Sequence, residues 1–172
     1  MSRQLDQIIK RSLRNLADDT HVRNWRAKEQ DWVNYFAHRY LLRECSPRGP
    51  LKEPSQIGID VAVPQPPGCG YKKQSVGRDL VIWSKCGDTC FDADWKASKH
   101  PLAILEWKVH RPRRHNRKVE HERAWLRAYC EWQPSVIAYA IEIDGRCSPT
   151  TLACIRFSAL KENKQWLELR LC

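Results

Sequence analysis

Apolar residues recur along the chain in two periods, and each period predicts a different kind of element. Steps of three and four residues, typical of amphipathic helices, cover residues 3–17, 24–44 and 117–133. Alternating or continuous apolar runs, typical of strands, cover residues 57–63, 79–84, 101–109, 135–143, 151–157 and 165–171. The polar residues 85–100 predict a loop. This order of elements predicts an α/β fold, with a central mixed sheet flanked by helices and a helical N-terminal segment.

The run from 101 to 109 combines a buried strand with two charged residues near its end. Because side chains alternate along a strand, Glu106 and Lys108 are expected on the same face, together with Leu102 and Ile104. A carboxylate and an ammonium at the end of an apolar stripe are costly to desolvate unless they pair with other groups or have a functional role. This strand is therefore the strongest candidate to carry functional residues.

A second acid comes within reach if two of the predicted strands pair. Antiparallel matching of residues 79–84 with residues 102–107 places Asp79 beside Glu106 and Lys108. Two carboxylates supply the oxygen ligands that hard divalent cations such as Mg²⁺ prefer. A neighbouring lysine is suited to orient or deprotonate an attacking water.

Asp79, a spacer and then Glu106-Trp107-Lys108 resemble the signature of the PD-(D/E)XK nucleases, the restriction-endonuclease-like superfamily. The order of a helix, three antiparallel strands, a helix and another strand is also similar, and the resemblance covers about residues 25–143. The proline that names the motif is absent, because Gly77-Arg78-Asp79 stands in its place. The resemblance implies one nuclease-like domain with a restriction-endonuclease-like core. Its parts would be a helical segment at 1–45, the catalytic core at 55–143 and extra strands at 144–172.

The resemblance also implies the residues that would carry the reaction. Asp79 and Glu106 would bind Mg²⁺ or Mn²⁺, and the Trp107 carbonyl would add a ligand. Lys108 would position or activate the water. In this family the helix before the sheet often adds a glutamate, and Glu29, which borders the apolar stripe of the 24–44 helix, is our candidate.

Other acids compete for the role of Glu29 or add to the site. Asp31 and Glu44 are weaker candidates from the same predicted helix. Asp60 is more typical of a polar residue on the less buried face of its strand. Glu29 itself also fits a solvated acid near a helix N-terminus, where the helix dipole favours negative charge.

The charge of the chain favours a polyanionic partner. Lysine and arginine number 30 against 20 aspartates and glutamates, which gives a net charge of +10, and nucleic acid is the commonest partner of such a surplus. The most basic stretch follows the central strand, although a charge run is often only a solvated face. We expect DNA-backbone contacts from there and from the loop before Asp79: Arg111, Arg113, Arg114, Arg117, Lys118, Lys72 and Lys73.

The sequence also restricts location and cysteine chemistry. No apolar run approaches the ~20 residues of a membrane span, and the N-terminus lacks the apolar segment of a secretory signal. We therefore expect an intracellular, cytoplasmic protein with no membrane partner. Its eight cysteines are then expected to be free thiols. Cys86 and Cys90 come nearest to a zinc-binding pair, but a second close pair is missing.

The leading functional hypothesis is a Mg²⁺-dependent deoxyribonuclease, of the endonuclease kind, acting on DNA phosphodiester bonds. A homodimer would let so small a chain cut both strands. Exonuclease action and an RNA substrate stay open. The alternatives are a non-catalytic nucleic-acid-binding protein on a nuclease-like fold, a subunit that binds an acidic protein, and a purely structural Glu106–Lys108 ion pair.

Overall fold

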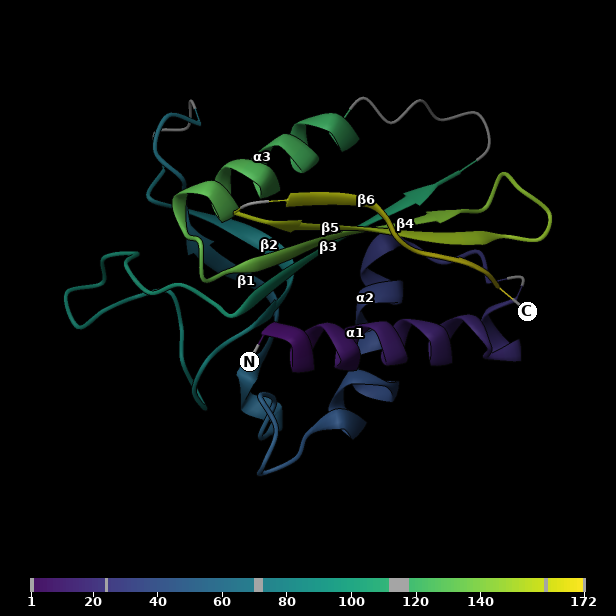
Figure 1. Ribbon diagram of the computed structural model, residues 1–172, viewed down its shortest axis with the longest axis horizontal. Helices are drawn as coiled ribbons and strands as arrows, with labels where there is room; N and C mark the ends of the chain where they lie inside the picture. Colours follow the sequence, from purple (N-terminus) through teal and green to yellow (C-terminus); the bar gives the residue numbers. More distant parts are fainter. Residues whose placement is uncertain (1, 24, 70–72, 112–117, 160, 172) are drawn as a thin grey trace.

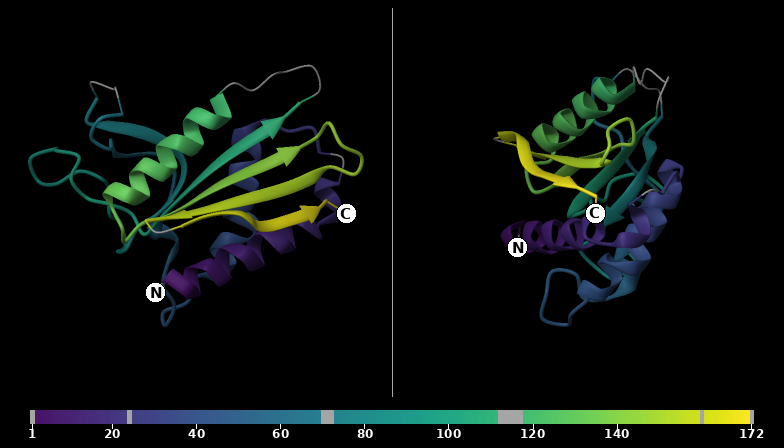
Figure 2. Two further views of the ribbon diagram at one scale, coloured as in Figure 1. Left: turned by 45° about the horizontal axis from the view of Figure 1, so that its top comes forward. Right: turned by 90° about the vertical axis from the view of Figure 1, so that its right-hand side faces the viewer.

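The computed structural model describes residues 2–23, 25–69, 73–111, 118–159 and 161–171 of the chain. One six-stranded mixed sheet forms its centre, with helices on both faces. Helix α3 (Lys118–Trp132) covers one face, and α1 (Ser2–Ala17) and α2 (Glu29–Arg39) cover the other (Figures 1 and 2). The predicted α/β class, with a mixed sheet flanked by helices, is confirmed.

The strands follow the order of the chain across the sheet, β1-β2-β3-β4-β5-β6. Their bounds are Ile57–Pro64, Ser75–Ile82, Ala103–His110, Ile137–Asp144, Thr151–Ser158 and Lys161–Arg170. All neighbours are antiparallel except β3 and β4, which run parallel. Parallel neighbours need a crossover connection, and α3 provides it. In the described part of the chain, no helix has the length and apolar character needed to span a bilayer.

Each face of the sheet packs its own apolar core. Along β3, Leu105 and Trp107 belong to the core beneath α1 and α2, whereas Ile104 belongs to the core beneath α3. Since side chains alternate, Glu106 and Lys108 follow Ile104 onto the α3 face. Strand β4 contributes to both cores, as predicted for a strand after a crossover helix. Leu102, expected beside Ile104, packs instead against the α1/α2 core, because it precedes the first residue of the strand.

The second helix is shorter than the predicted range of 24–44. It begins at Glu29, because Lys28 has an extended backbone and its amide donates to the Asp31 carboxylate at 2.9 Å. It ends at Arg39, and a separate 3₁₀ turn, η2 (Leu41–Glu44), follows. Two further 3₁₀ turns are η1 (Thr20–Val22) and η3 (Pro54–Gln56). Glu29 is therefore the first residue of α2, and Trp25 lies outside the helix.

Strands β1 and β2 change faces together at one rung of the sheet. Ile59 packs toward α1 and α2, but Val61, two residues later, packs toward α3. Asp60 between them has a left-handed backbone (φ +52°), a conformation that aspartate tolerates better than most residues. Asp79 faces Asp60 at this rung, where the β1–β2 pairing is interrupted without a change of register. Alternation therefore fails at Asp79, and its carboxylate is free to turn toward β3.

Candidate active site

Asp79 lies where β2 separates from β3. The ladder between these strands runs only from Ile82–Ala103 to Leu80–Leu105. At the next position the Trp107 amide donates to Asp79 Oδ2 at 2.7 Å. The carboxylate thus takes the place of a backbone acceptor and lies against the Glu106–Trp107 peptide. The predicted antiparallel pairing is confirmed, but its predicted register was wrong by one residue.

Glu106 is almost fully enclosed beneath α3. Its side chain is 9% exposed, and Oε1 accepts a hydrogen bond from Arg78 Nη1 at 3.3 Å. Arg78 comes from the strand that also carries Asp79, and its guanidinium lies 3.6 Å from the centre of the Trp125 ring on α3. Glu106 Oε2 is buried and has no hydrogen-bond partner among the described residues. Buried polar atoms of this kind are rare in folded proteins and call for an explanation.

Lys108 joins three elements through its ammonium group. Nζ lies 2.8 Å from Glu29 Oε1 at the start of α2 and 3.0 Å from Glu122 Oε1 on α3. Glu122 Oε2, like Glu106 Oε2, is buried without a partner in the described part of the chain. The residues predicted from the sequence, Glu29, Asp79, Glu106 and Lys108, are thus brought to one end of the β2–β3 pair.

A second charged cluster borders the first along β4. Glu142, which pairs with Lys108 in the β3–β4 register, accepts hydrogen bonds from Arg123 of α3 and lies 3.1 Å from His110 Nε2. Between the two clusters lies a cavity of about 10 Å³, lined by Glu106, Lys108 and Glu142 among others. That is about the room of one water molecule. On this side, α3 therefore closes tightly over the carboxylates.

The site opens toward the start of α2. Side-chain exposure rises from 9% at Glu106 and 13% at Lys108 to 19% at Glu122 and 35% at Glu29. A substrate would therefore approach past Glu29 and not through α3.

Burial and crowding of like charges set the protonation of the site. Burial raises the pKa of Glu106 well above its usual range, and the negative charge of Asp79 raises it further. Burial also raises the pKa of Asp79, in spite of the hydrogen bond from Trp107. Burial alone would lower the pKa of Lys108, but the hydrogen bond and charge of Glu29, with the charge of Glu122, place it above its ordinary value. Lys108 is therefore protonated at neutral pH and cannot accept a proton from water in this arrangement.

The raised carboxyl pKa values predict how stability depends on pH. Below the ordinary carboxyl range, folded and unfolded chains are both protonated, so burial of these groups carries no ionic penalty. From about pH 5 to pH 8 these carboxyls hold protons in the folded protein that the unfolded chain has lost, so their contribution to the free energy of unfolding falls as the pH rises. Burial lowers the pKa of His100, which acts in the opposite direction in part of this window. The hydrogen bond from Arg146 lowers the pKa of Asp144 to about 2, so the ionisation of Asp144 affects stability below this pH window.

Urea denaturation of the wild type and Glu106→Gln at about pH 5 and pH 8 measures this effect, because glutamine mimics the protonated acid at every pH. Between pH 5 and pH 8, the free energy of unfolding of the variant relative to that of the wild type is expected to rise by at least about 1.4 kcal/mol, the equivalent of one pKa unit. Parallel pH profiles of the two proteins would show that Glu106 is ionised in the folded state as it is in solution.

Two residues of the site, Arg78 and Glu122, were not among the predicted site residues. Glu122 carried a usable signal, because it falls three residues after Val119 and three before Trp125, on the apolar stripe of its helix. Arg78 carried none, since regular alternation would place it on the face opposite Asp79. Only the change of faces at the Asp60–Asp79 rung brings both residues to the site.

The other predicted site residues lie around the site or outside the described part of the chain. Trp107 contributes its amide, while its ring is buried in the α1/α2 core against Phe36. Arg111 is exposed at the end of β3, and Lys73 is exposed in the loop before β2. Lys72, Arg113, Arg114, Arg117 and the side chain of Lys118 lie outside the described residues.

The alternative acids have other partners or positions. Asp31 accepts from the Lys28 amide at the start of α2, and Glu44 pairs with Arg11. Asp60 is exposed on β1. None of the three is a contact of Lys108 or Glu106 in the described structure.

The described residues do not form a metal site with several protein ligands. No cluster of three or more histidine, cysteine, aspartate or glutamate side chains converges there in a metal-binding arrangement. Cys90, Cys130 and Cys154 are buried free thiols, and Cys86 and Cys147 are exposed. Any cation at the site would therefore depend on fewer protein ligands, with Asp79 and Glu106 as the available pair.

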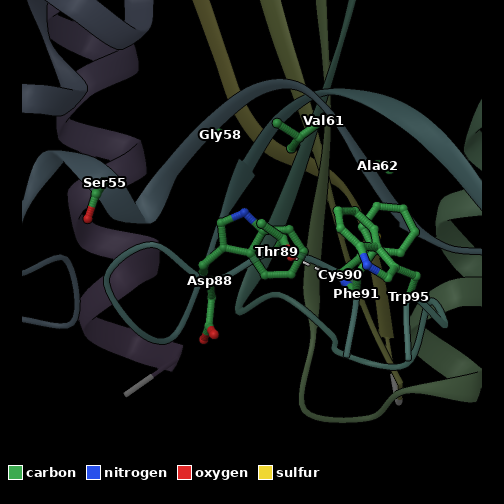
Figure 3. Close-up of a pocket in the computed structure, with 10 residues that line it drawn as sticks. Ser55, Gly58, Val61, Ala62, Asp88, Thr89, Cys90, Phe91 and Trp95 are labelled. Atoms are coloured by element: carbon green, nitrogen blue, oxygen red, sulfur yellow. Dashed lines mark hydrogen bonds between the residues drawn. The ribbon is translucent and has the colours of Figure 1, made fainter. Parts of the chain in front are cut away.

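A separate apolar pocket lies between β1 and the loop after β2. It has a volume of about 420 Å³, and Figure 3 shows Val61 and Ala62 of β1 on one side and Phe91 and Trp95 of the loop on the other. Trp83, also in its lining, comes four residues after Asp79, about 13 Å along an extended strand. The pocket has few polar groups and stands apart from the charged site.

The chain matches no family model, no curated protein and no solved structure at a significant level.

Proposed function

We propose that the protein is a metal-dependent nuclease that hydrolyses DNA phosphodiester bonds, on a restriction-endonuclease-like core. One observation carries the proposal. Asp79, Glu106 and Lys108, from adjacent strands, gather with Glu29 at a single point of a strongly basic chain. Burial and the charge of Asp79 raise the pKa of Glu106, and a bound cation would stabilise both carboxylates in their ionised form, which favours a site completed by a cation.

The available ligands fit a magnesium-like ion. Mg²⁺ commonly binds proteins through one or two carboxylates and keeps several waters, so it does not need a full protein cage. Asp79 and Glu106 provide such a pair, and the buried, unpartnered Glu106 Oε2 is an oxygen without another role in the described structure. A bound Mg²⁺ or Mn²⁺ would supply charge stabilisation at the scissile phosphate and lower the pKa of a water ligand.

The residues around the carboxylates have separate tasks in this proposal. Arg78 holds one oxygen of Glu106 and fixes the orientation of its side chain. Glu29 and Glu122 hold the Lys108 ammonium in place. Because Lys108 is protonated, it would orient the attacking water and offset negative charge on the phosphate. We assign proton acceptance to a carboxylate or to solvent.

Basic residues after β3 would bind the DNA backbone. Arg111, directly after β3, is the predicted contact nearest to Lys108 in the described chain. The segment 112–117, which carries Arg113, Arg114 and Arg117, follows β3, which holds Glu106 and Lys108, and precedes α3, which holds Glu122. Contacts of this kind position the backbone without reading its sequence.

A second candidate is a non-catalytic nucleic-acid-binding protein on the same fold. One observation favours it: Lys108 is neutralised by two glutamates, Glu106 by Arg78, and Glu142 by Arg123. Such a network could be purely structural. The two candidates differ in catalysis and not in DNA binding.

Cleavage of circular and linear DNA, with Mg²⁺ or with EDTA, separates the two candidates. The nuclease proposal expects loss of intact DNA that requires Mg²⁺ or Mn²⁺, and cutting of the circular form would identify endonuclease action. DNA that is bound but stays intact at every Mg²⁺ and Mn²⁺ concentration would favour the non-catalytic candidate.

A further inference from the structure

A groove of about 510 Å³ lies at the end of β3, and its lining includes Arg111, one of the predicted DNA contacts. It runs between the segment before α2, the end of β3 and the turn after β4. Its lining includes Trp25, Arg26, Ala27, Arg111, Gly145 and Arg146. A hollow of this volume is within the size range of sites for small organic ligands, including a single nucleotide.

The groove comes nearest to the charged site at the end of β3 and the segment before α2. Ala27 in the groove precedes Glu29 by two residues, and the Arg111 guanidinium lies 3.4 Å from the Ala27 carbonyl. Val109, also in the lining, directly follows Lys108, but its side chain faces the α1/α2 core, so the groove lies on the other face of β3 and approaches the charged site at the end of the strand. The site is most exposed at Glu29, which is the side where the groove begins. A ligand in the groove would thus reach the charged site around the end of β3, past Glu29.

Trp25 gives the groove a partly exposed aromatic surface. Its side chain is held by two other rings, with centroid distances of 4.7 Å to Trp32 and 5.2 Å to Tyr35. Trp25 nevertheless remains 36% exposed. It is one of only two large hydrophobic residues that are exposed in the described chain. A supported ring that faces a groove is suited to stack on a planar group, and base–aromatic stacking accepts any base.

The cations of the groove differ in how far they are already neutralised. Arg146 Nε and Nη2 donate to Asp144 at 2.8 and 2.6 Å, so its charge is compensated. Arg26 and Arg111 are exposed and have no carboxylate partner among the described residues. Two uncompensated guanidinium groups beside an aromatic ring match the phosphates and base of a nucleotide.

We propose that this groove binds one nucleotide of an unpaired nucleic-acid strand, with its base on Trp25 and its phosphates at Arg26 and Arg111. In the interior of a duplex the faces of the bases are covered by their neighbours, so there Trp25 can stack only on a base that has left the helix. The proposal rests on the proposed nuclease function for its substrate. It narrows that substrate to DNA with single-stranded nucleotides beside the cleavage point.

Fluorescence anisotropy with a labelled thymidine 12-mer, and with a 12-base-pair duplex, tests the groove in EDTA. Trp25→Leu retains apolar bulk but loses the stacking surface, and it is expected to weaken single-strand binding by about 5- to 160-fold, the range for one base–aromatic stack. Duplex binding should change less than about twofold. Arg26→Ala should lower the slope of log K against log salt by about 0.7 for the single strand.

Arg48→Ala is the matched control, because Arg48 is exposed in the turn after η2 and lies outside the groove lining. It should leave single-strand affinity within about twofold of the wild type. Circular dichroism and a melting curve verify the fold of Trp25→Leu, and Arg26→Ala tests the groove without disturbing the ring cluster. Wild-type single-strand affinity in both variants would overturn the proposal, as would equal losses with the single strand and the duplex.

Binding in EDTA does not require hydrolysis, so the groove and the nuclease proposal can fail separately. Single-strand binding that depends on Trp25, without Mg²⁺-dependent cleavage, would support the groove and reject the nuclease. Mg²⁺-dependent cleavage with no effect of either groove substitution would support the nuclease and reject the groove.

Discussion

Glu106→Gln is expected to abolish DNA hydrolysis, with a loss of at least about 10³-fold. Metal-assisted charge stabilisation contributes several kcal/mol to such reactions, and each 1.36 kcal/mol is a factor of ten in rate. Glutamine loses the charge that a cation needs, but it keeps an oxygen that accepts the hydrogen bond from Arg78 Nη1. The fold and DNA binding should therefore persist. Single-turnover cleavage of a labelled DNA substrate in Mg²⁺ gives the rate.

Glu168→Gln is the matched control for this substitution. Glu168 is an exposed strand residue on β6 and has no contact with the charged site. The same isosteric change there should leave the rate within about twofold of the wild type. If Glu106→Gln cleaved as fast as Glu168→Gln, Glu106 would have no part in the reaction.

Lys108→Met is expected to reduce both activity and stability. Removal of a positioned charge from an active site commonly reduces the rate 10²- to 10³-fold. The substitution also leaves Glu29 and Glu122 facing each other without the cation between them. Removal of one partner from a buried pair costs about 3–5 kcal/mol, and because Glu29 is 35% exposed we expect about 2 kcal/mol. For a chain of this length the melting temperature should fall by about 4–8 °C.

A second substitution separates the two roles of Lys108. Lys108→Met with Glu122→Gln removes the uncompensated glutamate and should recover most of the lost stability, while cleavage stays absent. Lys164→Met, an exposed lysine on β6, controls for the loss of a surface charge. Full recovery of cleavage in the double variant would mean that Lys108 acts only as a structural ion pair.

The sequence predicts the scaffold of the site better than its details. The apolar run of β3 and the continuous run of β4 identify the buried strands, because burial on both faces leaves a clear hydrophobic pattern. The face shared by Glu106 and Lys108 follows from strand alternation alone. The register of β2 against β3 was predicted one residue away from that observed, since 20 residues separate the two strands and no tight turn fixes their pairing.

Other features depend on tertiary contacts that no local pattern contains. Arg78 reaches Glu106 only because the sheet changes faces at the Asp60–Asp79 rung. The start of α2 at Glu29 is set by the Lys28–Asp31 hydrogen bond, whereas the apolar periodicity continues on both sides of the helix. The Trp25 groove combines three segments that are distant in sequence. The periodicity of apolar residues does not predict such arrangements.

The central claim is that Asp79 and Glu106 share one divalent cation. Calorimetric titration of Mn²⁺ into the wild type and Glu106→Gln tests it most directly. We expect one site in the wild type, with a dissociation constant at or below the millimolar range. Protons should be released near neutral pH as the buried carboxyls ionise, and the variant should show no saturable binding. Equal binding to both proteins, or to neither, would contradict a cation site at these carboxylates.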